Sequence, residues 1–384
     1  MQRISFFYRD TGDVASAVAQ RGNYFIDAVK KHPAADGYDL MVYCVNSSGH
    51  SRGEGVRVKT FRSLAQGNTA GFLARAIDEM FIGLLIGFAS IFRRSDLFVI
   101  SMPPYLSAII IIFSQIMLRR SYAIDIRDMY PRAYLDAGLI RDDGVLHSFF
   151  QSINKFIFKR AAFIICATRG QRREVSLLRC EDTAITIYNG FPEALLRAER
   201  SSTDGFRVVT HGTLGVYQNI DFIIELAESL EQENIEFVVI GHGNKAGAIE
   251  QASCKNISYL GELSFDETIE KVASCDVGLC VRDNSPQSRY SFPVKAWEYI
   301  GLKMPILIYP RCEVSDVFPN LDGLHTFDKL NLEAFRSSIL HFREIKKKNE
   351  ADLSLQDNAG INAYTRETLA EKFANLVIGH VNDK

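Results

Sequence analysis

Short apolar runs alternate with longer segments of helical periodicity along the first half of the chain. The short runs, each followed by a polar or glycine-containing loop, predict strands. The longer segments, in which apolar positions recur every three or four residues, predict helices. We expect strands at 4–8, 40–44, 56–61, 97–101, 122–126, 163–167 and 184–188, and helices at 16–31, 69–92, 105–118, 145–160 and 169–179.

The alternation pauses at residues 192–205, which are polar and show no periodicity. We interpret this segment as a linker between domains, because the same alternation restarts directly after it. A charged stretch then precedes a final helix near 362–380, which we expect to pack back onto the first domain. The second half predicts strands at 206–210, 235–240, 257–260, 277–281 and 306–309, and helices at 220–232, up to about 252, at 265–274 and from Pro293 onward.

Strands that alternate with helices indicate a parallel sheet covered on both faces. The chain therefore predicts an α/β protein with two doubly wound, Rossmann-like domains. Their expected bounds are 1–191, joined by a C-terminal helix at 362–384, then the linker 192–205 and a second domain at 206–361. Ligands of such sheets bind beyond the carboxyl ends of the strands, so the loops 9–15, 101–104 and 127–131 should line one cleft. Two such domains facing each other across a cleft would suit an enzyme with two substrates.

Composition adds a charge asymmetry to this picture. The 384 residues are 47% hydrophobic and 23% charged, as in an ordinary globular protein. Residues 1–190 hold 24 Lys and Arg against 17 Asp and Glu, whereas residues 191–384 hold 20 against 29. A basic first half suggests an anionic partner, such as lipid headgroups, a phosphorylated acceptor or nucleic acid, although a solvated charged surface explains it equally.

Cysteine and histidine usage gives no sign of a metal or disulfide framework. The seven cysteines include no C-x-x-C pair, and most lie in apolar runs, which indicates buried reduced thiols in a reducing cytosol. The eight histidines are scattered without ligand spacing, so we expect no metal site. The N-terminal residues lead straight into a strand and show no signal-peptide pattern.

Two apolar runs, 81–92 and 106–118, each end beside a pair of arginines. Each run is well short of the roughly 20 residues that a membrane-spanning helix needs. One interpretation is a buried helix of an α/β domain. The other is a monotopic contact, in which apolar residues enter the membrane interface and the arginines bind anionic headgroups.

The stretch 291–305 carries the clearest chemical pattern. Pro293 is suited to a first helical turn and Ser291 is a candidate helix cap. The free N–H groups at a helix start stabilise an anion, and Lys295 would add a full charge. Glu298, one turn later, could accept hydrogen bonds from hydroxyls. The alternative interpretation makes these residues an ordinary helix start and a solvated face.

Three further loops follow strands of the second domain, at 211–215, 241–243 and 260–262. Each contains glycine, which permits the close backbone approach that nucleotide phosphates need. His211 and His242 lie in these loops, where a surface or backbone-capping histidine is as reasonable as a ligand.

With these motifs the chain resembles the family 4 retaining glycosyltransferases of the two-domain GT-B fold, in particular the bacterial branch that builds surface polysaccharides. The resemblance covers most of the chain. It rests on segments similar to family motifs: Tyr188–Phe191, Gly212–Gly215, Gly241–Gly243, Leu260–Gly261, Ser291–Pro305 and Ile124–Pro131.

The resemblance implies roles for individual residues. Glu298 would bind the ribose hydroxyls of the donor, Lys295 would face its diphosphate, and Asp128 would face the reacting sugar and acceptor. Asp128 could instead pair with Arg127 or Arg132, or cap the turn that follows it. The remaining donor-binding residues implied by the motifs are Gly212, Thr213, Gly215, Gly241, His242, Gly261, Ser291 and Pro293.

The chain also departs from the family pattern. Tyr290 stands where the family has the first glutamate of a pair, and Thr213 stands where many members have arginine. Gln218 or Asn219 falls where those members have lysine. The leaving diphosphate must still be stabilised, and Lys295, Arg289, Arg282 and the helix start remain as candidates for that task.

The resulting expectation is an enzyme that transfers a sugar from a UDP-sugar, or a GDP-sugar, to a glycan or a polyprenyl-diphosphate-linked acceptor. It would act in bacterial surface polysaccharide synthesis, in the cytoplasm or on the inner face of the membrane. The donor would be a substrate, and we expect neither a resident cofactor nor a nucleic-acid partner. Two alternatives stay open: a sugar-nucleotide 2-epimerase, and a non-catalytic sugar-nucleotide-binding scaffold of a polysaccharide assembly complex.

Overall fold

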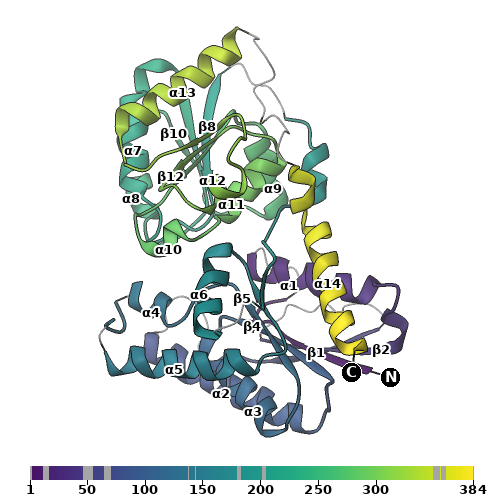
Figure 1. Ribbon diagram of the computed structural model, residues 1–384. Helices are drawn as coiled ribbons and strands as arrows, with labels where there is room; N and C mark the ends of the chain where they lie inside the picture. The colour runs from purple at the N-terminus through teal and green to yellow at the C-terminus, as the bar shows by residue number, and fades with distance from the viewer. Residues whose placement is uncertain are drawn as a thin grey trace. The chain divides into compact units, whose positions relative to one another are not determined.

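The computed structural model of the protein describes residues 2–11, 17–45, 55–64, 71–136, 138–142, 144–179, 183–200, 205–348, 355 and 360–383. The chain divides into two compact units (Figure 1). The first comprises Met1–Asn189 together with Arg366–Lys384, and the second comprises Gly190–Thr365. Parts of two predicted segments, residues 12–15 and 201–204, lie outside the described residues, as does Cys180.

The first unit contains a seven-stranded sheet in which every neighbouring pair is parallel, in the order β3-β2-β1-β4-β5-β6-β7. Its strands are β1 Gln2–Phe7, β2 Tyr38–Val45, β3 Val56–Phe61, β4 Leu97–Met102, β5 Tyr122–Ile126, β6 Ile164–Cys166 and β7 Ala184–Thr186. Its helices are α1 Ala17–Lys31, α2 Phe72–Ile91, α3 Tyr105–Met117, α4 Arg132–Asp136, α5 Val145–Arg160, α6 Arg169–Arg179 and α14 Arg366–Asn382, with the short 3-10 helix η1 at Ala35–Gly37.

Helices cover both faces of this sheet. On one face α1 packs against α14, where the rings of Phe25 and Phe373 stack with centroids 4.1 Å apart (Figure 1). On the other face α2, α3, α5 and α6 enclose the apolar core, which includes Ile86, Ile111 and Ile157. Every residue of β4 and β5 is buried, as expected for central strands covered on both sides.

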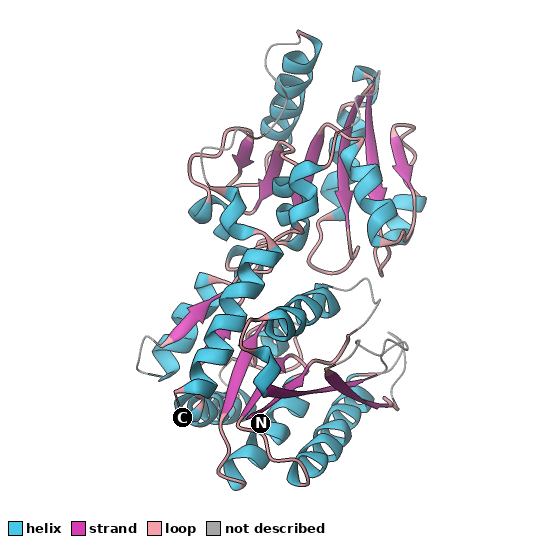
Figure 2. Cartoon of the chain, turned by 90° about the vertical axis from the view of Figure 1, so that its right-hand side faces the viewer, coloured by secondary structure: helices cyan, strands magenta, loops and turns pink. Residues whose placement is uncertain are grey.

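The second unit contains a six-stranded sheet, again parallel throughout, in the order β10-β9-β8-β11-β12-β13. Its strands are β8 Phe206–His211, β9 Ile235–Ile240, β10 Ile257–Tyr259, β11 Val277–Val281, β12 Ile306–Tyr309 and β13 Leu324–Thr326. Its helices are α7 Ile220–Ser229, α8 Ala246–Glu250, α9 Phe265–Ala273, α10 Pro286–Arg289, α11 Val294–Gly301, α12 Glu313–Val317 and α13 Leu332–Lys347, with 3-10 helices η2 Glu193–Arg197, η3 Glu231–Glu233 and η4 Ile361–Tyr364. Figure 2 shows helices on both sides of each sheet.

The predicted fold class is confirmed: both units are doubly wound parallel sheets. Three features differ from the expectation. Part of the segment interpreted as linker forms η2, whose Leu195 is buried and faces Gly301 of α11. The charged stretch expected before the final helix lies partly in α13. This helix forms because its apolar residues Phe335, Ile339 and Phe342 pack on the core. We also did not predict strand β13 or the helices α4, α10, α12 and α13.

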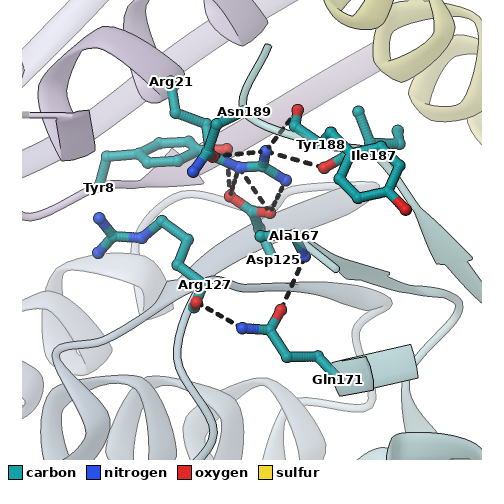
Figure 3. A network of polar contacts seen from close by, with 9 residues as sticks. All are labelled: Tyr8, Arg21, Asp125, Arg127, Ala167, Gln171, Ile187, Tyr188 and Asn189. Atoms are coloured by element: carbon teal, nitrogen blue, oxygen red, sulfur yellow. Dashed lines mark hydrogen bonds and ion pairs between the residues drawn. The ribbon is translucent and has the colours of Figure 1, made fainter. Parts of the chain in front are cut away.

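A buried ion pair ties together segments of the first unit that lie far apart in sequence (Figure 3). Arg21 of α1 donates to both carboxylate oxygens of Asp125 in β5, the shortest contact being 2.8 Å, and both side chains are almost wholly buried. The same guanidinium donates to the carbonyl oxygens of Ile187 and Tyr188 and to Asn189 Oδ1, at 2.9 to 3.1 Å. The network therefore anchors the stretch at which the chain leaves the first unit.

Candidate functional site

The strand order of the second unit locates its candidate site. The chain runs outward from β8 to β9 and β10, and then returns to place β11 on the other side of β8. Adjacent strands whose connections leave in opposite directions open a crevice at their carboxyl ends, where doubly wound sheets bind ligands. The loops that begin at Gly212 and Arg282 follow these two strands. Both loops contain residues that the sequence singled out.

Glycines pack the loops after β8 and β9 against each other. Gly241 has φ of +131°, and a Cβ atom placed on it would lie 1.9 Å from the carbonyl oxygen of Gly212. Gly243 has φ of +154°, and its Cβ atom would lie 2.4 Å from the carbonyl oxygen of Leu214. No other residue allows this approach, because only glycine lacks the Cβ atom and readily adopts positive φ. The G-x-G motif therefore holds two loops together at the switch point.

The same packing decides which backbone groups remain for a ligand. The amide of Gly212 donates to Ile240 O at 3.0 Å, and that of Gly241 donates to Gly261 O at 2.7 Å. By contrast, the backbone N–H groups of Thr213 and Gly243 donate to no acceptor within the described part of the chain. Among these loop residues, Thr213 and Gly243 are the better candidates for backbone contact with an anion.

Lys295 lies inside this end of the sheet rather than on its surface. Lys295 is only 7% exposed. Its Nζ donates to Thr210 Oγ1 at 3.2 Å and to Gln218 Oε1 at 3.3 Å. Its side chain passes beneath Gly212, whose added Cβ atom would meet Lys295 Cε at 3.9 Å. Burial lowers the pKa of Lys295, and nearby Arg282 lowers it further, against the opposite effects of Cys280 and Glu298. An anion bound here would favour the charged ammonium.

Glu298 is brought against His211 at the end of β8. His211 Nε2 lies 3.3 Å from Glu298 Oε2, and both side chains are buried. Burial, together with the charge of Lys295, lowers the pKa of His211 to about 3. The imidazole is therefore neutral near pH 7, and this contact is not an ion pair although the two atoms are close. The atoms are also not aligned for a hydrogen bond, since Nε2 has no hydrogen-bond partner among the described residues.

Pro293 lies at the start of the helix, one position before its first turn, but Ser291 does not cap the helix as we predicted. Helix α11 begins at Val294, with Pro293 in the capping position and no side-chain cap. The hydroxyl of Ser291 instead donates to Ser288 O at 2.9 Å and accepts a hydrogen bond from Arg282. The prediction of Ser291 as a helix cap is therefore wrong: its hydroxyl is used within the loop that precedes the helix.

Lys245 is a cationic residue that the sequence interpretation missed. It follows the G-x-G loop, and its Nζ donates to the backbone carbonyl of Gln218 at 2.9 Å. Gln218 also accepts from Lys295 through its side chain, and it pairs with Arg282 in an isolated antiparallel bridge. Two ammonium groups, from the loop after β9 and from helix α11, thus donate to Gln218, the position at which we noted a missing lysine, and Arg282 contacts it through the backbone. The spacing of Lys245 two residues after Gly243 is the only signal that the sequence carried.

The other predicted donor-site residues lie farther out. His242 is exposed and its Nδ1 lies 3.2 Å from Glu262 Oε1. Arg289, the last residue of α10, is exposed and donates to Asn284 Oδ1 at 2.8 Å, and Tyr290 is 51% exposed. Of the three cations proposed for the diphosphate, Lys295 donates to Gln218, Arg282 pairs with Gln218 through its backbone, and Arg289 lies at the exposed end of α10.

In the first unit, the loop of Asp128 follows β5 and is fastened to its neighbours. The side-chain amide of Gln171 makes two contacts: its Nε2 donates to Arg127 O at 2.6 Å, and its Oε1 accepts from the backbone N–H of Ala167 at 2.9 Å (Figure 3). The guanidinium of Arg127 donates to Pro103 O in the loop after β4. Arg132, one of the partners considered for Asp128, pairs with Glu174 at 3.0 Å. Asp128 therefore sits on a loop held at the carboxyl ends of three strands.

Comparison with solved structures identifies the fold. Sucrose-phosphate synthase from Thermosynechococcus elongatus superposes with a TM-score of 0.70 at 13% identity, over 100% of each chain. Anabaena HepE in complex with UDP-glucose superposes with a TM-score of 0.58 at 13% identity, over 100% of this chain and 98% of that one. A putative UDP-N-acetylglucosamine 2-epimerase from Listeria monocytogenes gives a TM-score of 0.60 at 10% identity, over 100% and 97%.

The chain has the GT-B fold. These likenesses show the fold alone, since all identities are far below the level at which activity is shared. No protein-family model matches the sequence, and no curated protein matches it either. Within the residues that the structure describes, no three His, Cys, Asp or Glu side chains are grouped as metal ligands.

Proposed function

We propose that the protein is a glycosyltransferase that moves a sugar from a nucleotide diphosphate sugar to a glycan or polyprenyl-diphosphate-linked acceptor. The observation that carries the proposal is that Lys245 and Lys295 both donate to Gln218 at the switch point of the second unit, where Arg282 pairs with Gln218 through the backbone. A UDP-sugar is favoured over a GDP-sugar because HepE, which shares the fold, was solved with UDP-glucose. The proposed setting is bacterial surface polysaccharide synthesis on the cytoplasmic face of the membrane.

The cations suit the charge that develops on the leaving diphosphate. Loss of a nucleoside diphosphate places negative charge on phosphate oxygens, and preorganised donors aimed at that charge lower the barrier. Lys245 and Arg282 from two loops and Lys295 from the first turn of α11 would supply this charge, with the backbone amides of Thr213 and Gly243 as further donors. Arg and Lys from other loops would thereby replace the cations that are absent at residues 213 and 218.

In a retaining reaction of the family 4 type, a phosphate oxygen of the leaving group would take the proton of the acceptor hydroxyl on the same face of the sugar. The protein then contributes positioning and charge stabilisation rather than a covalent nucleophile. Glu298 would bind ribose hydroxyls, and Asp128 on its fastened loop would bind the acceptor or the transferred sugar. The acceptor would lie with the first unit and the donor with the second.

The decisive experiment measures nucleotide release from a panel of UDP- and GDP-sugars, with and without membrane lipid extract as the acceptor source. Lys245→Met and Lys295→Met keep an unbranched side chain that is one atom shorter and remove the charge. Each variant should lower kcat/KM by about 10- to 1000-fold, the range for loss of one preorganised electrostatic contact. Glu298→Ala should lower it comparably if the carboxylate binds ribose.

Lys329→Met is the matched control, since Lys329 is an exposed lysine of the same unit. Its kinetics should equal those of the unaltered protein. Thermal unfolding of each variant checks that the loss is not one of folding. Unchanged kcat/KM in both Lys245→Met and Lys295→Met would reject the donor-site assignment. Nucleotide binding without turnover of any sugar would instead favour the non-catalytic scaffold.

A 2-epimerase remains the second candidate, because one structure of the same fold is a putative UDP-N-acetylglucosamine 2-epimerase. The pairs His211–Glu298 and His242–Glu262 provide the acidic and histidine side chains that such chemistry calls for. Epimerisation exchanges the hydrogen at C2 with solvent, whereas glycosyl transfer leaves it in place. Incubation of UDP-N-acetylglucosamine in deuterated water, followed by proton NMR, therefore separates the two: deuterium at C2 would identify an epimerase.

A further inference from the structure

Helix α2 presents an apolar face to the outside of the first unit. Ten of its residues are exposed, and all but Ala74 and Arg75 are large and apolar. Leu73, Leu84 and Phe88 are 58 to 72% exposed. We name the set that shares one side of the helix the α2 face; its members are Leu73, Ile77, Met80, Phe81, Leu84, Phe88 and Ile91. A surface helix normally turns such a stripe toward the core.

The α2 face is outward because the opposite side of the helix is already packed. Ile82 and Ile86 are buried in the core, and α2 approaches α3 closely at Gly83, where an added Cβ atom would lie 2.9 Å from Ser107 Cα. The second apolar run behaves differently, since α3 buries most of its isoleucines. Of the two interpretations of these runs, burial describes α3, and only α2 keeps a continuous apolar stripe outside.

Neighbouring helices extend the apolar surface. Phe113 of α3 is exposed and stacks on the half-exposed Phe156 of α5, with ring centroids 5.8 Å apart. At the start of α5, Val145 is 87% exposed and Phe149 is 55% exposed. No described helix is long and apolar enough to cross a membrane. The exposed side chains of α3 and α5 extend the apolar surface beyond α2.

Charge identifies that partner. The exposed charged side chains of α2, α3, α5 and the turns after α2 and α3 are all cationic: Arg75, Arg94, Arg119, Lys155, Lys159 and Arg160. An apolar surface alone would fit a protein partner, a second copy of this chain or a membrane. Two copies related by a two-fold axis would bring like charges together around the contact. An anionic lipid surface satisfies the apolar stripe and the cations at once.

We propose that the α2 face docks the protein on an anionic bilayer, with its apolar side chains in the interface and the surrounding cations on lipid headgroups. The inference deepens the proposed function, on which it rests for the acceptor. Phe72, at the start of α2, packs edge-on against Tyr134 at 5.6 Å, and Tyr134 packs on Tyr130 at 4.8 Å, two residues after Asp128. The apolar surface thus continues to the loop proposed to bind a lipid-linked acceptor.

Flotation with vesicles tests the proposal. The full chain is mixed with phosphatidylcholine vesicles, with or without phosphatidylglycerol, at low and high salt. We expect binding to the anionic vesicles that weakens as salt rises, because exposed charge interactions are screened. The triple variant Leu73→Glu, Leu84→Glu, Phe88→Glu should lose binding by roughly 10-fold or more, since each side chain contributes buried apolar area. The control Leu177→Glu, at an 80% exposed site on α6, should bind as the unaltered protein does.

The cations have a test of their own. Lys155→Glu with Lys159→Glu should lower binding to anionic vesicles by roughly 10-fold or more, because each basic residue near the surface is attracted to the anionic headgroups. Binding to neutral vesicles should not fall. Titration of UDP in the absence of vesicles should be unchanged in all these variants, which separates failure of the docking proposal from failure of the donor site. Absence of binding at low salt, or a dimer that the triple variant dissociates, would overturn the proposal.

Discussion

The two units share one architecture but use its ends and faces differently. Both are parallel sheets whose strand order reverses once, at β1 and β4 in the first unit and at β8 and β11 in the second. At its switch point the second unit gathers glycines with positive φ and cationic side chains around Gln218. The first unit instead places an aromatic cluster around Tyr130 and a buried ion pair, and leaves the outside of α2 apolar.

This difference teaches that a doubly wound sheet supplies a place for a ligand but not the ligand's chemistry. A crevice forms where the connections of two adjacent strands leave in opposite directions. The loop residues then determine whether an anion or an apolar group is stabilised there. If the two units fold independently, a substitution in one should leave the stability of the other unchanged. The chain has one tryptophan, and Trp297 is buried in the second unit. Its fluorescence therefore reports unfolding of that unit, while circular dichroism reports both.

The largest effect should follow Gly241→Ala. The new methyl group would overlap the carbonyl oxygen of Gly212 and would have to adopt a φ of +131°. We expect the free energy of unfolding of the second unit to fall by about 4 kcal/mol or more, at the upper end of point substitutions. The tryptophan transition in denaturant measures it.

Gly215→Ala is the control for this change. Its φ lies outside the left-handed region, and an added Cβ atom would meet only Thr213 Cγ2 at an ordinary 3.5 Å. We expect a change of less than about 1 kcal/mol. Equal destabilisation by the two variants would show that close packing of the loops is not the reason for Gly241.

Asp125→Asn should destabilise the first unit by about 3–5 kcal/mol. The change leaves the Arg21 guanidinium buried without its counter-charge, and this cost exceeds the loss of the hydrogen bonds themselves. The circular dichroism transition should split while the tryptophan transition keeps its midpoint. A tryptophan midpoint that moves as far as the circular dichroism midpoint would contradict the separation of the units.

The pH dependence of the second unit should reveal His211. Its pKa is held at about 3, so the folded protein excludes a proton that the unfolded chain binds below about pH 6.5. Stability should therefore be lost as the pH falls from about 6.5 toward 3, with a slope of up to roughly 1.4 kcal/mol per pH unit from this residue. His211→Gln should remove that part of the slope, whereas His242→Gln, at an exposed site, should keep it.

The smallest effect on folding should come from Leu84→Glu on the α2 face. The side chain is 58% exposed, so little packing is lost, and we expect a change within about 0.5 kcal/mol. Circular dichroism melts measure this value. A loss of several kcal/mol would mean that the residue packs against protein, which would count against the docking surface.

Local sequence patterns predicted the strands and their parallel arrangement because buried parallel strands read as continuous apolar runs. The pattern also located Lys295 and Glu298 near the sheet end. It did not predict Lys245, because the contact of its ammonium with Gln218 depends on how two loops pack. The ion pair of Arg21 and Asp125 was not predicted either, because the two residues lie 104 positions apart and meet only through the packing of α1 on the sheet.

Two other failures have local causes. Helix α13 was missed because its many charged residues made the segment look like a solvated stretch, although its apolar positions keep helical spacing. Ser291 was read as a cap because serine before a proline often has that role. In the structure its hydroxyl is taken up by Ser288 and Arg282, two contacts that a sequence does not display.

The packing of α14 on α1 has a consequence for the order in which the two units fold during synthesis. The first unit needs residues from both ends of the described chain, because Phe373 stacks on Phe25 and Gln2 donates to Val381 O at 3.0 Å. The second unit, Gly190–Thr365, is continuous and is synthesised before α14. On the ribosome the second unit can therefore complete its folding before the first unit does. Synthesis of the first unit begins earlier, but one face of its sheet stays incompletely covered until α14 has been synthesised.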